Sequence, residues 1–78
     1  MSKTVRKGSW YRYVPTLQDA FFNELPTGSL VKVVNVQGGR TSGHWRNVED
    51  RNGNIYFVEI ASLFGPKPDP NKFADLYR

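Results

Sequence analysis

The sequence predicts one small all-β domain, and three observations indicate this. Runs of β-branched and aromatic residues recur along the chain, and Gly, Pro and Asn clusters separate them. Three of these runs follow one another with short connections, which is the pattern of an antiparallel meander. The chain has 78 residues and no cysteine, so its core must come from aliphatic side chains and from five Phe, four Tyr and two Trp.

The first strand is expected over residues 9–14. Trp10, Arg12 and Val14 would lie on one side of this strand, and Tyr11 and Tyr13 on the other, because side chains alternate along an extended chain. Pro15 then ends the strand.

Residues 16–25 leave two alternatives open. Leu17, Phe21, Phe22 and Leu25 have helical spacing, and Thr16 with Asp19 forms a start similar to a capping box. The other interpretation is a long folded-back loop whose Leu and Phe side chains plug one end of the domain. We favour the loop, and Pro26 ends either structure.

A turn at residues 26–29 introduces the strongest predicted strand, residues 30–36. Val31 and Val33 share one face of it, and Val34 with Val36 the other, so a bulge or a change of face is expected. Residues 38–43 form a Gly-rich connection to the next strand, which is predicted over residues 44–49.

Residues 50–53 predict a hairpin turn in which Asn52 and Gly53 supply the positive-φ positions. The returning strand is expected over residues 55–59. Residues 60–64 are expected to form a short helical turn or a terminal strand.

The character of the chain changes at Gly65. Alternating prolines predict an extended segment that leaves the end of the sheet. Asp69 and Pro70 could then start a short helix with Phe73, Leu76 and Tyr77 on one face, docked on its own domain or on a partner. The sequence therefore divides into an arm (1–8), a β-domain (9–64) and a Pro-rich tail with a short C-terminal helical turn (65–78).

The net charge of +4 is concentrated in residues 1–14, that is, in the arm and the start of the first strand. Residues 1–14 hold four Lys or Arg residues and no acid, whereas residues 15–65 hold one more acid than base. Such an arm is typical of a solubilising tail, or it contacts phosphates or an acidic partner. No signal-peptide core and no membrane-length apolar run is present, so we expect a cytoplasmic protein.

Catalytic and metal chemistry find no matching constellation in the sequence. His44 is the single histidine and Cys is absent, which excludes multi-His metal sites and a Cys–His pair. A pair of Ser42 and His44 has no obvious orienting acid. We therefore expect no enzyme, no cofactor and no metal.

Four motifs carry a resemblance to a known fold. Ser9-Trp-Tyr-Arg-Tyr resembles the Ala-Leu-Tyr-Asp-Tyr opening of SH3 domains, and Leu25-Pro-Thr-Gly-Ser-Leu-Val-Lys-Val-Val is similar to the Leu-Pro-x-Gly step of bacterial SH3-like domains. Trp45-Arg-Asn-Val resembles their Trp-Tyr-Lys-Val strand, and Phe57-Val58 followed by Leu63 resembles their closing motif. Over residues 9–64 the resemblance implies a small SH3-like β-barrel of about five strands. It also implies that residues 15–29 are a long first loop.

The resemblance implies that Tyr11 and Tyr13 line a peptide groove and that Trp45 faces the ligand. Val48 then lies on the core face; the alternative register would bury Asn47, at a cost of about 1–3 kcal/mol. Glu59 and Ser62 stand where SH3 domains have a proline and a tyrosine, so a proline-rich peptide is not the expected ligand.

Taken together, these features predict a non-enzymatic module that binds a partner protein or peptide through a shallow aromatic groove. The expected groove residues are Tyr11, Tyr13, Trp45, Arg46 and Phe57. The alternative is a purely structural role, in which these rings cover the sheet and bind no ligand. A second function is single-stranded nucleic-acid binding by the same face, with phosphate contacts from Lys3, Arg6, Lys7, Arg12, Arg40 and Arg51. Monomer and homodimer both stay open, because a free edge strand can pair with its own copy.

Overall fold

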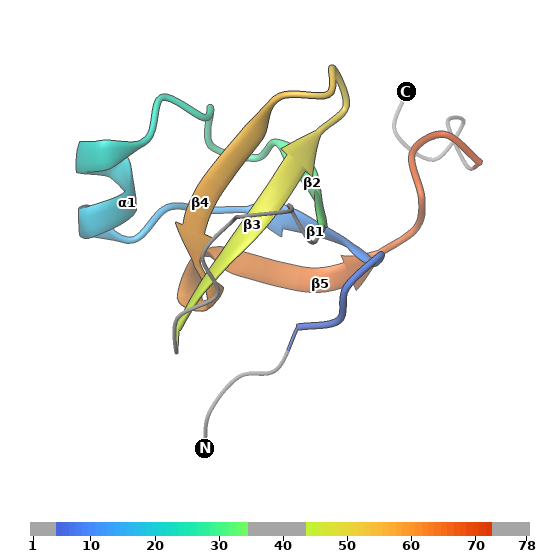
Figure 1. Cartoon of the computed structure of the whole chain (residues 1–78), viewed down its shortest axis with the longest axis horizontal. Coiled ribbons are helices and arrows are strands. Elements are labelled where there is room, and N and C mark those ends of the chain that lie inside the picture. Colours follow the sequence, from blue (N-terminus) through green and yellow to red (C-terminus); the bar gives the residue numbers. More distant parts are fainter. Residues whose placement is uncertain (1–4, 35–43, 73–78) are drawn as a thin grey trace.

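In the described part of the chain, five antiparallel strands form one sheet in the order β4-β3-β2-β1-β5 (Figure 1). The computed structural model describes residues 5–34 and 44–72. The elements are β1 (Trp10–Tyr13), α1 (Leu17–Phe22), β2 (Leu30–Val33), β3 (Trp45–Asp50), β4 (Ile55–Glu59), the 3-10 turn η1 (Ile60–Ser62) and β5 (Leu63–Lys67). The all-β prediction is confirmed, with one short helix between β1 and β2.

The closed barrel that the resemblance implied is not present in the described part of the chain. Strands β1 to β4 follow one another as a meander, and β5 returns to pair with β1. Strands β4 and β5 therefore lie at the two edges of the sheet and do not pair with each other. The structure is a single unclosed five-stranded sheet.

The core lies on one face of the sheet and draws on every strand. Its fully buried side chains include Tyr13, Val31, Val48, Val58 and Leu63. Each of these residues belongs to a different strand, so strand pairing itself brings the core together. The β-branched valines in the centre of the core are the residue type that packs well on the pleated surface of a sheet.

Strand β2 agrees with the pattern predicted for its first residues. Val31 and Val33 share the core-facing side, and Val34 is half-buried. Strand β2 ends at Val33, and residues 35–43, which include Val36 and the predicted Gly-rich connection, lie outside the described residues.

The preferred loop interpretation of residues 16–25 is wrong, because α1 occupies Leu17–Phe22. Thr16 is the N-cap predicted by its spacing from Asp19, and its hydroxyl accepts a hydrogen bond from the Asp19 N–H at 3.2 Å. A six-residue helix is too short to be stable alone. Tertiary contacts must therefore hold it, and these are described below.

The hairpin turn between β3 and β4 differs from prediction in one detail. Gly53 has a φ of 88°, whereas no residue other than glycine in residues 5–34 and 44–72 has a positive φ, so Asn52 does not supply a second such position. The Asp50 carboxylate instead orders the turn, accepting the N–H groups of Asn52 and Asn54 at 2.9 Å each.

Both alternatives for residues 60–64 occur in series, since η1 is followed directly by β5. The prediction that the chain leaves the sheet at Gly65 is wrong, because β5 continues to Lys67, which pairs with Trp10. Asp69 then caps a turn by accepting the Asn71 N–H at 2.8 Å. Residues 73–78, with the expected terminal helix and its docking, lie outside the described residues.

No helix in residues 5–34 and 44–72 combines the length and the apolar character that crossing a membrane requires.

Gly65 provides a test of the β1–β5 packing. It has a φ of 148°, and a Cβ added there would lie 2.9 Å from the Lys67 nitrogen and 3.3 Å from Cδ1 of Tyr11. We expect Gly65→Ala to lower the free energy of unfolding by roughly 3 kcal/mol, from backbone strain plus overpacking. Urea denaturation measures this change.

The matched control is Gly53→Ala. Gly53 also has positive φ, but a Cβ there meets nothing within 4 Å. We expect a cost of about 1 kcal/mol, from strain alone. Equal losses in the two variants would contradict the close approach of β5 to Tyr11.

Candidate functional site

Helix α1 is held against the sheet by polar side chains that reach the backbone of β4. Oδ2 of Asp19 accepts hydrogen bonds from the Glu59 N–H, at 3.0 Å, and from the Ser62 hydroxyl. The Asn23 amide donates to the Phe57 carbonyl and to Oδ1 of Asp19, both at 3.2 Å. Because β4 is an edge strand, these side chains satisfy backbone groups that no further strand pairs.

A second set of contacts fixes the start of the helix to the same place. The Thr16 hydroxyl donates to Oε1 of Glu59 at 2.7 Å, and the Thr16 N–H donates to the Ser62 hydroxyl oxygen at 3.1 Å. The Val14 N–H donates to the Ser62 carbonyl at 2.8 Å. The start of α1 is thus attached to the junction between β4 and η1, and its end is attached to Phe57 within β4.

These anchors reverse the usual polarity of a surface helix. Asp19 is 0% exposed, whereas Leu17, Phe21 and Phe22 are 94%, 84% and 70% exposed. An ordinary amphipathic helix buries its apolar stripe against the core. The prediction that these side chains plug one end of the domain is wrong for all three, and only Leu25 enters the core.

Trp45 and Phe57 form a stacked aromatic pair on the outer side of β3 and β4. Their ring centroids are 5.3 Å apart, with an angle of 20° between the ring planes. Both side chains are half-buried, while Val48 and Val58 on the opposite side are fully buried. The predicted register, with Trp45 outward and Val48 in the core, is confirmed.

The aromatic pair and α1 belong to one region of the molecule. The Phe57 carbonyl accepts a hydrogen bond from the Asn23 side-chain amide, and Asn23 directly follows Phe22 in the chain. We call the set of apolar side chains carried here the α1–β4 surface: Leu17, Phe21, Phe22, Trp45 and Phe57. Glu59 pairs with Trp45 and Glu24 follows Phe22 by two residues, and residues 13–31 and 52–66 contain no Lys or Arg.

The predicted groove does not include Tyr11 and Tyr13. They are 3% and 0% exposed, and both belong to the core cluster. The Tyr11 hydroxyl accepts the Arg6 N–H at 2.8 Å, and the Tyr13 hydroxyl has no hydrogen-bond partner in the described part of the chain. Alternation correctly put the two rings on one side of β1, but that side faces inward.

Arg46 lies beside the aromatic pair in sequence, but its described contact is with the backbone. It is half-buried, and Nη1 donates to the Trp45 carbonyl at 2.7 Å. Because side chains alternate along a strand, Arg46 lies on the same side of β3 as Val48, opposite Trp45.

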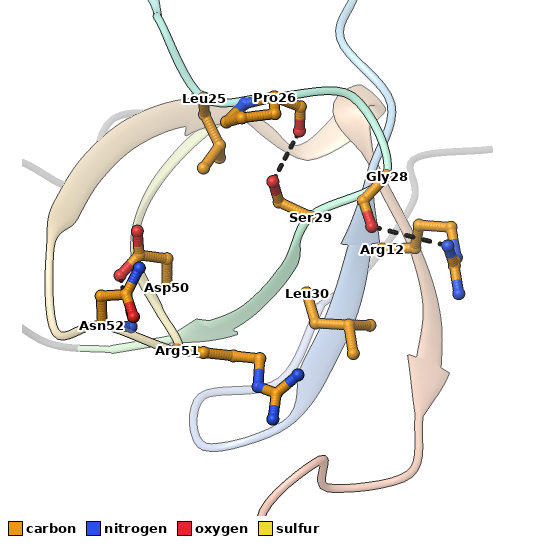
Figure 2. Close-up of a pocket in the computed structure, with 9 residues that line it drawn as sticks. All are labelled: Arg12, Leu25, Pro26, Gly28, Ser29, Leu30, Asp50, Arg51 and Asn52. Atoms are coloured by element: carbon orange, nitrogen blue, oxygen red, sulfur yellow. Dashed lines mark hydrogen bonds between the residues drawn. The ribbon is translucent and has the colours of Figure 1, made fainter. Parts of the chain in front are cut away.

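The predicted phosphate contacts are dispersed. Lys3 and Arg40 lie outside the described residues, and Arg6 and Lys7 are exposed in the N-terminal segment. Arg12 and Arg51 line one pocket of about 440 Å³ between the residues 25–30 and the hairpin turn (Figure 2). This pocket is at the Asp50 end of the six-residue strand β3, roughly 17 Å along the strand from Trp45.

Comparison with models of known protein families, with curated proteins and with solved structures finds no match to this chain. Within residues 5–34 and 44–72, no three His, Cys, Asp or Glu residues are grouped so as to hold a metal ion. The site therefore has to be interpreted from its own geometry.

Sequence reasoning missed the exposed apolar residues of α1. The signal was present, because Asp19 falls within the first turn of the helix and Asn23 follows four residues later on the same face. A pair of polar residues on one face of a helix can hold that face against the rest of the protein. Only the hydrogen-bond partners on β4 and η1 show that this face of α1 is held there.

Asp19 is the test of this anchor. Asp19→Ala removes the acceptor for three donors and leaves the part-buried Glu59 N–H without its partner. We expect the free energy of unfolding to fall by about 3 kcal/mol, and the Glu59 and Asn23 amides to exchange faster with solvent. Urea denaturation and amide hydrogen exchange measure the two effects.

Gln18→Ala is the control, since Gln18 is the exposed neighbour of Asp19 on the same helix. We expect it to change stability by less than about 0.5 kcal/mol. If the two variants unfold alike, the carboxylate does not hold α1.

Ionisation of Tyr13 makes the free energy of unfolding fall as the pH rises in the alkaline range. Burial, and then the charge of Asp19, raise the pKa of Tyr13 from 10.0 to about 12. A pKa raised by folding means that the stabilisation is complete below pH 10 and is lost as the pH rises through 12. We expect wild type to lose on the order of 3 kcal/mol more than Tyr13→Phe over this range.

Urea denaturation of both proteins at a series of pH values checks this expectation. Near neutral pH, Tyr13→Phe should be as stable as wild type or more stable, because it removes a buried hydroxyl that has no partner in the described residues. Parallel pH profiles would show that Tyr13 ionises equally easily in both states.

Proposed function

We propose that this chain is an SH3-like protein-interaction module that binds a partner protein through the α1–β4 surface. The SH3-like part is supported by the order of elements: a long segment follows β1, a tryptophan begins β3 and faces outward, and β5 returns to β1. The topology is that of an open sheet, so the proposal concerns chain order and not barrel closure.

The observation that carries the proposal is the outward apolar face of α1. Leu17, Phe21 and Phe22 are exposed because Asp19 fixes the opposite face of the helix, so turning the helix inward would break a buried polar network. Burying one large apolar side chain contributes about 1.5–3 kcal/mol. A rigid set of such side chains is suited to be the centre of an interface.

The charges around this surface indicate the chemistry of the partner. Glu59 pairs with Trp45, Glu24 follows Phe22 by two residues, and no Lys or Arg occurs in residues 13–31 or 52–66. Arg46 follows Trp45 in the chain but shares the opposite side of β3 with Val48. A partner segment with apolar side chains and adjacent basic residues would therefore match both the rings and the local charge.

Single-stranded nucleic-acid binding is the less favoured function. It requires stacked rings and a cationic track on the same surface. Here the Trp45–Phe57 pair has acidic neighbours, and the pocket with Arg12 and Arg51 is at the other end of β3. This separation favours the protein-interaction proposal.

The test is capture of a partner by immobilised protein. Trp45→Ala and Phe21→Ser each remove a ring of the α1–β4 surface, and we expect each to reduce capture at least tenfold, as loss of an interface centre does. Phe21 is 84% exposed, so Phe21→Ser should leave the free energy of unfolding unchanged within about 0.5 kcal/mol.

Phe64→Ala is the matched control for these variants. Phe64 is a 46% exposed aromatic side chain on β5, at the opposite edge of the sheet from β4. It should capture the partner as wild type does. Undiminished capture by Trp45→Ala and Phe21→Ser together would reject the surface.

A further inference from the structure

The pocket near the hairpin turn combines two cationic side chains with an apolar floor. Leu25, Pro26 and Leu30 contribute the apolar part, and Arg12 and Arg51 contribute the charge (Figure 2). It lies apart from the α1–β4 surface, because β3 places Asp50 and Trp45 at its opposite ends. The proposed function does not use it.

Neither guanidinium group is neutralised within the described residues. An ion pair in this part of the chain joins Lys32 to Glu49 and does not involve Arg12 or Arg51. Arg12 donates to the Gly28 carbonyl at 3.5 Å, which is at the limit of a hydrogen bond. Both arginines are exposed, so their five N–H donors can reach an incoming anion.

Asp50 also lines the pocket, but its oxygens are already used by its own turn. Oδ1 accepts the N–H groups of Asn52 and Asn54 at 2.9 Å each, and Oδ2 accepts the Asn54 amide at 3.3 Å. The carboxylate therefore orders the hairpin and does not occupy Arg51. The described lining residues carry two positive charges, on Arg12 and Arg51, and one negative charge, on Asp50, so the net charge of the lining is positive.

The positions of the arginines decide the shape of the ligand. Figure 2 shows the two guanidinium groups on different sides of Leu30: the Arg51 side chain extends toward Leu30, whereas the Arg12 side chain points outward beyond it. They cannot both hold the two oxygens of one small anion. An extended ligand with successive anionic groups can engage each of them in turn.

The lining distinguishes between the two extended polyanions. Nucleic-acid strands gain affinity by stacking bases on aromatic rings, and none of the described residues that line this pocket is aromatic. Carboxylates match the planar guanidinium fork and bind it through paired hydrogen bonds. We propose that this pocket binds an acidic peptide segment, with one carboxylate on Arg12 and another on Arg51.

The proposal is tested by titrating the isotope-labelled protein with a capped hexaglutamate peptide at low salt and following amide chemical shifts. We expect the Ser29, Leu30 and Asn52 amides to shift, because these residues line the pocket. Arg12→Gln and Arg51→Gln should each weaken binding about tenfold, as loss of a charge-assisted pair does. A capped hexaglutamine peptide should produce no shifts.

Arg6→Gln is the matched control, because it removes one charge from an exposed arginine outside the pocket. It should bind the peptide as wild type does, and so should Trp45→Ala, which keeps this test separate from that of the α1–β4 surface. Equal weakening by all three arginine variants would mean that only net charge matters and would overturn the proposal. Binding of hexathymidylate in preference to hexaglutamate, or no pocket shifts with hexaglutamate, would overturn it as well.

Discussion

The buried carboxylate of Asp19 is the interaction on which the arrangement of this domain depends. It accepts hydrogen bonds from the Glu59 backbone, the Ser62 hydroxyl and the Asn23 amide, and it is fully excluded from solvent. A buried charge is tolerated only when such donors surround it. The segment between β1 and β2 is consequently fixed in one position against β4 and η1. A helix of six residues could not maintain that position by its own stability.

The two ends of β3 have different properties. At the Trp45 end, α1 covers the β4 edge with side chains and turns its apolar residues outward, beside the stacked pair and among acidic neighbours. At the Asp50 end, Arg12 and Arg51 line a pocket without carboxylate partners in the described residues. Covering the β4 edge also blocks one route to a homodimer, since Asp19 and Asn23 already occupy backbone groups that a second copy would need.

Particular elements show how far sequence reasoning reached. Alternation and turn chemistry, which depend on residues close together in the chain, predicted the strands β1 to β4 and the turn after Asp50. They also predicted that Val48 faces inward and Trp45 outward. The assignment of Tyr11 and Tyr13 to a groove did not hold, because alternation identifies which residues share a side of a strand and not which side is covered. Continuation of β5 to Lys67 depends on its pairing with Trp10, a residue from the other end of the domain.

The amino-acid sequence by itself determined that the domain is built of β-strands, where most strands begin and end, and which side chains share a face, because these properties are set by neighbouring residues. Tertiary structure alone decided that the strands form an open sheet and that α1 faces its apolar residues outward. The physical reason is the distance in sequence: Asp19 and its Ser62 partner are 43 residues apart. The burial of a carboxylate at one position depends on donors that only folding brings to it.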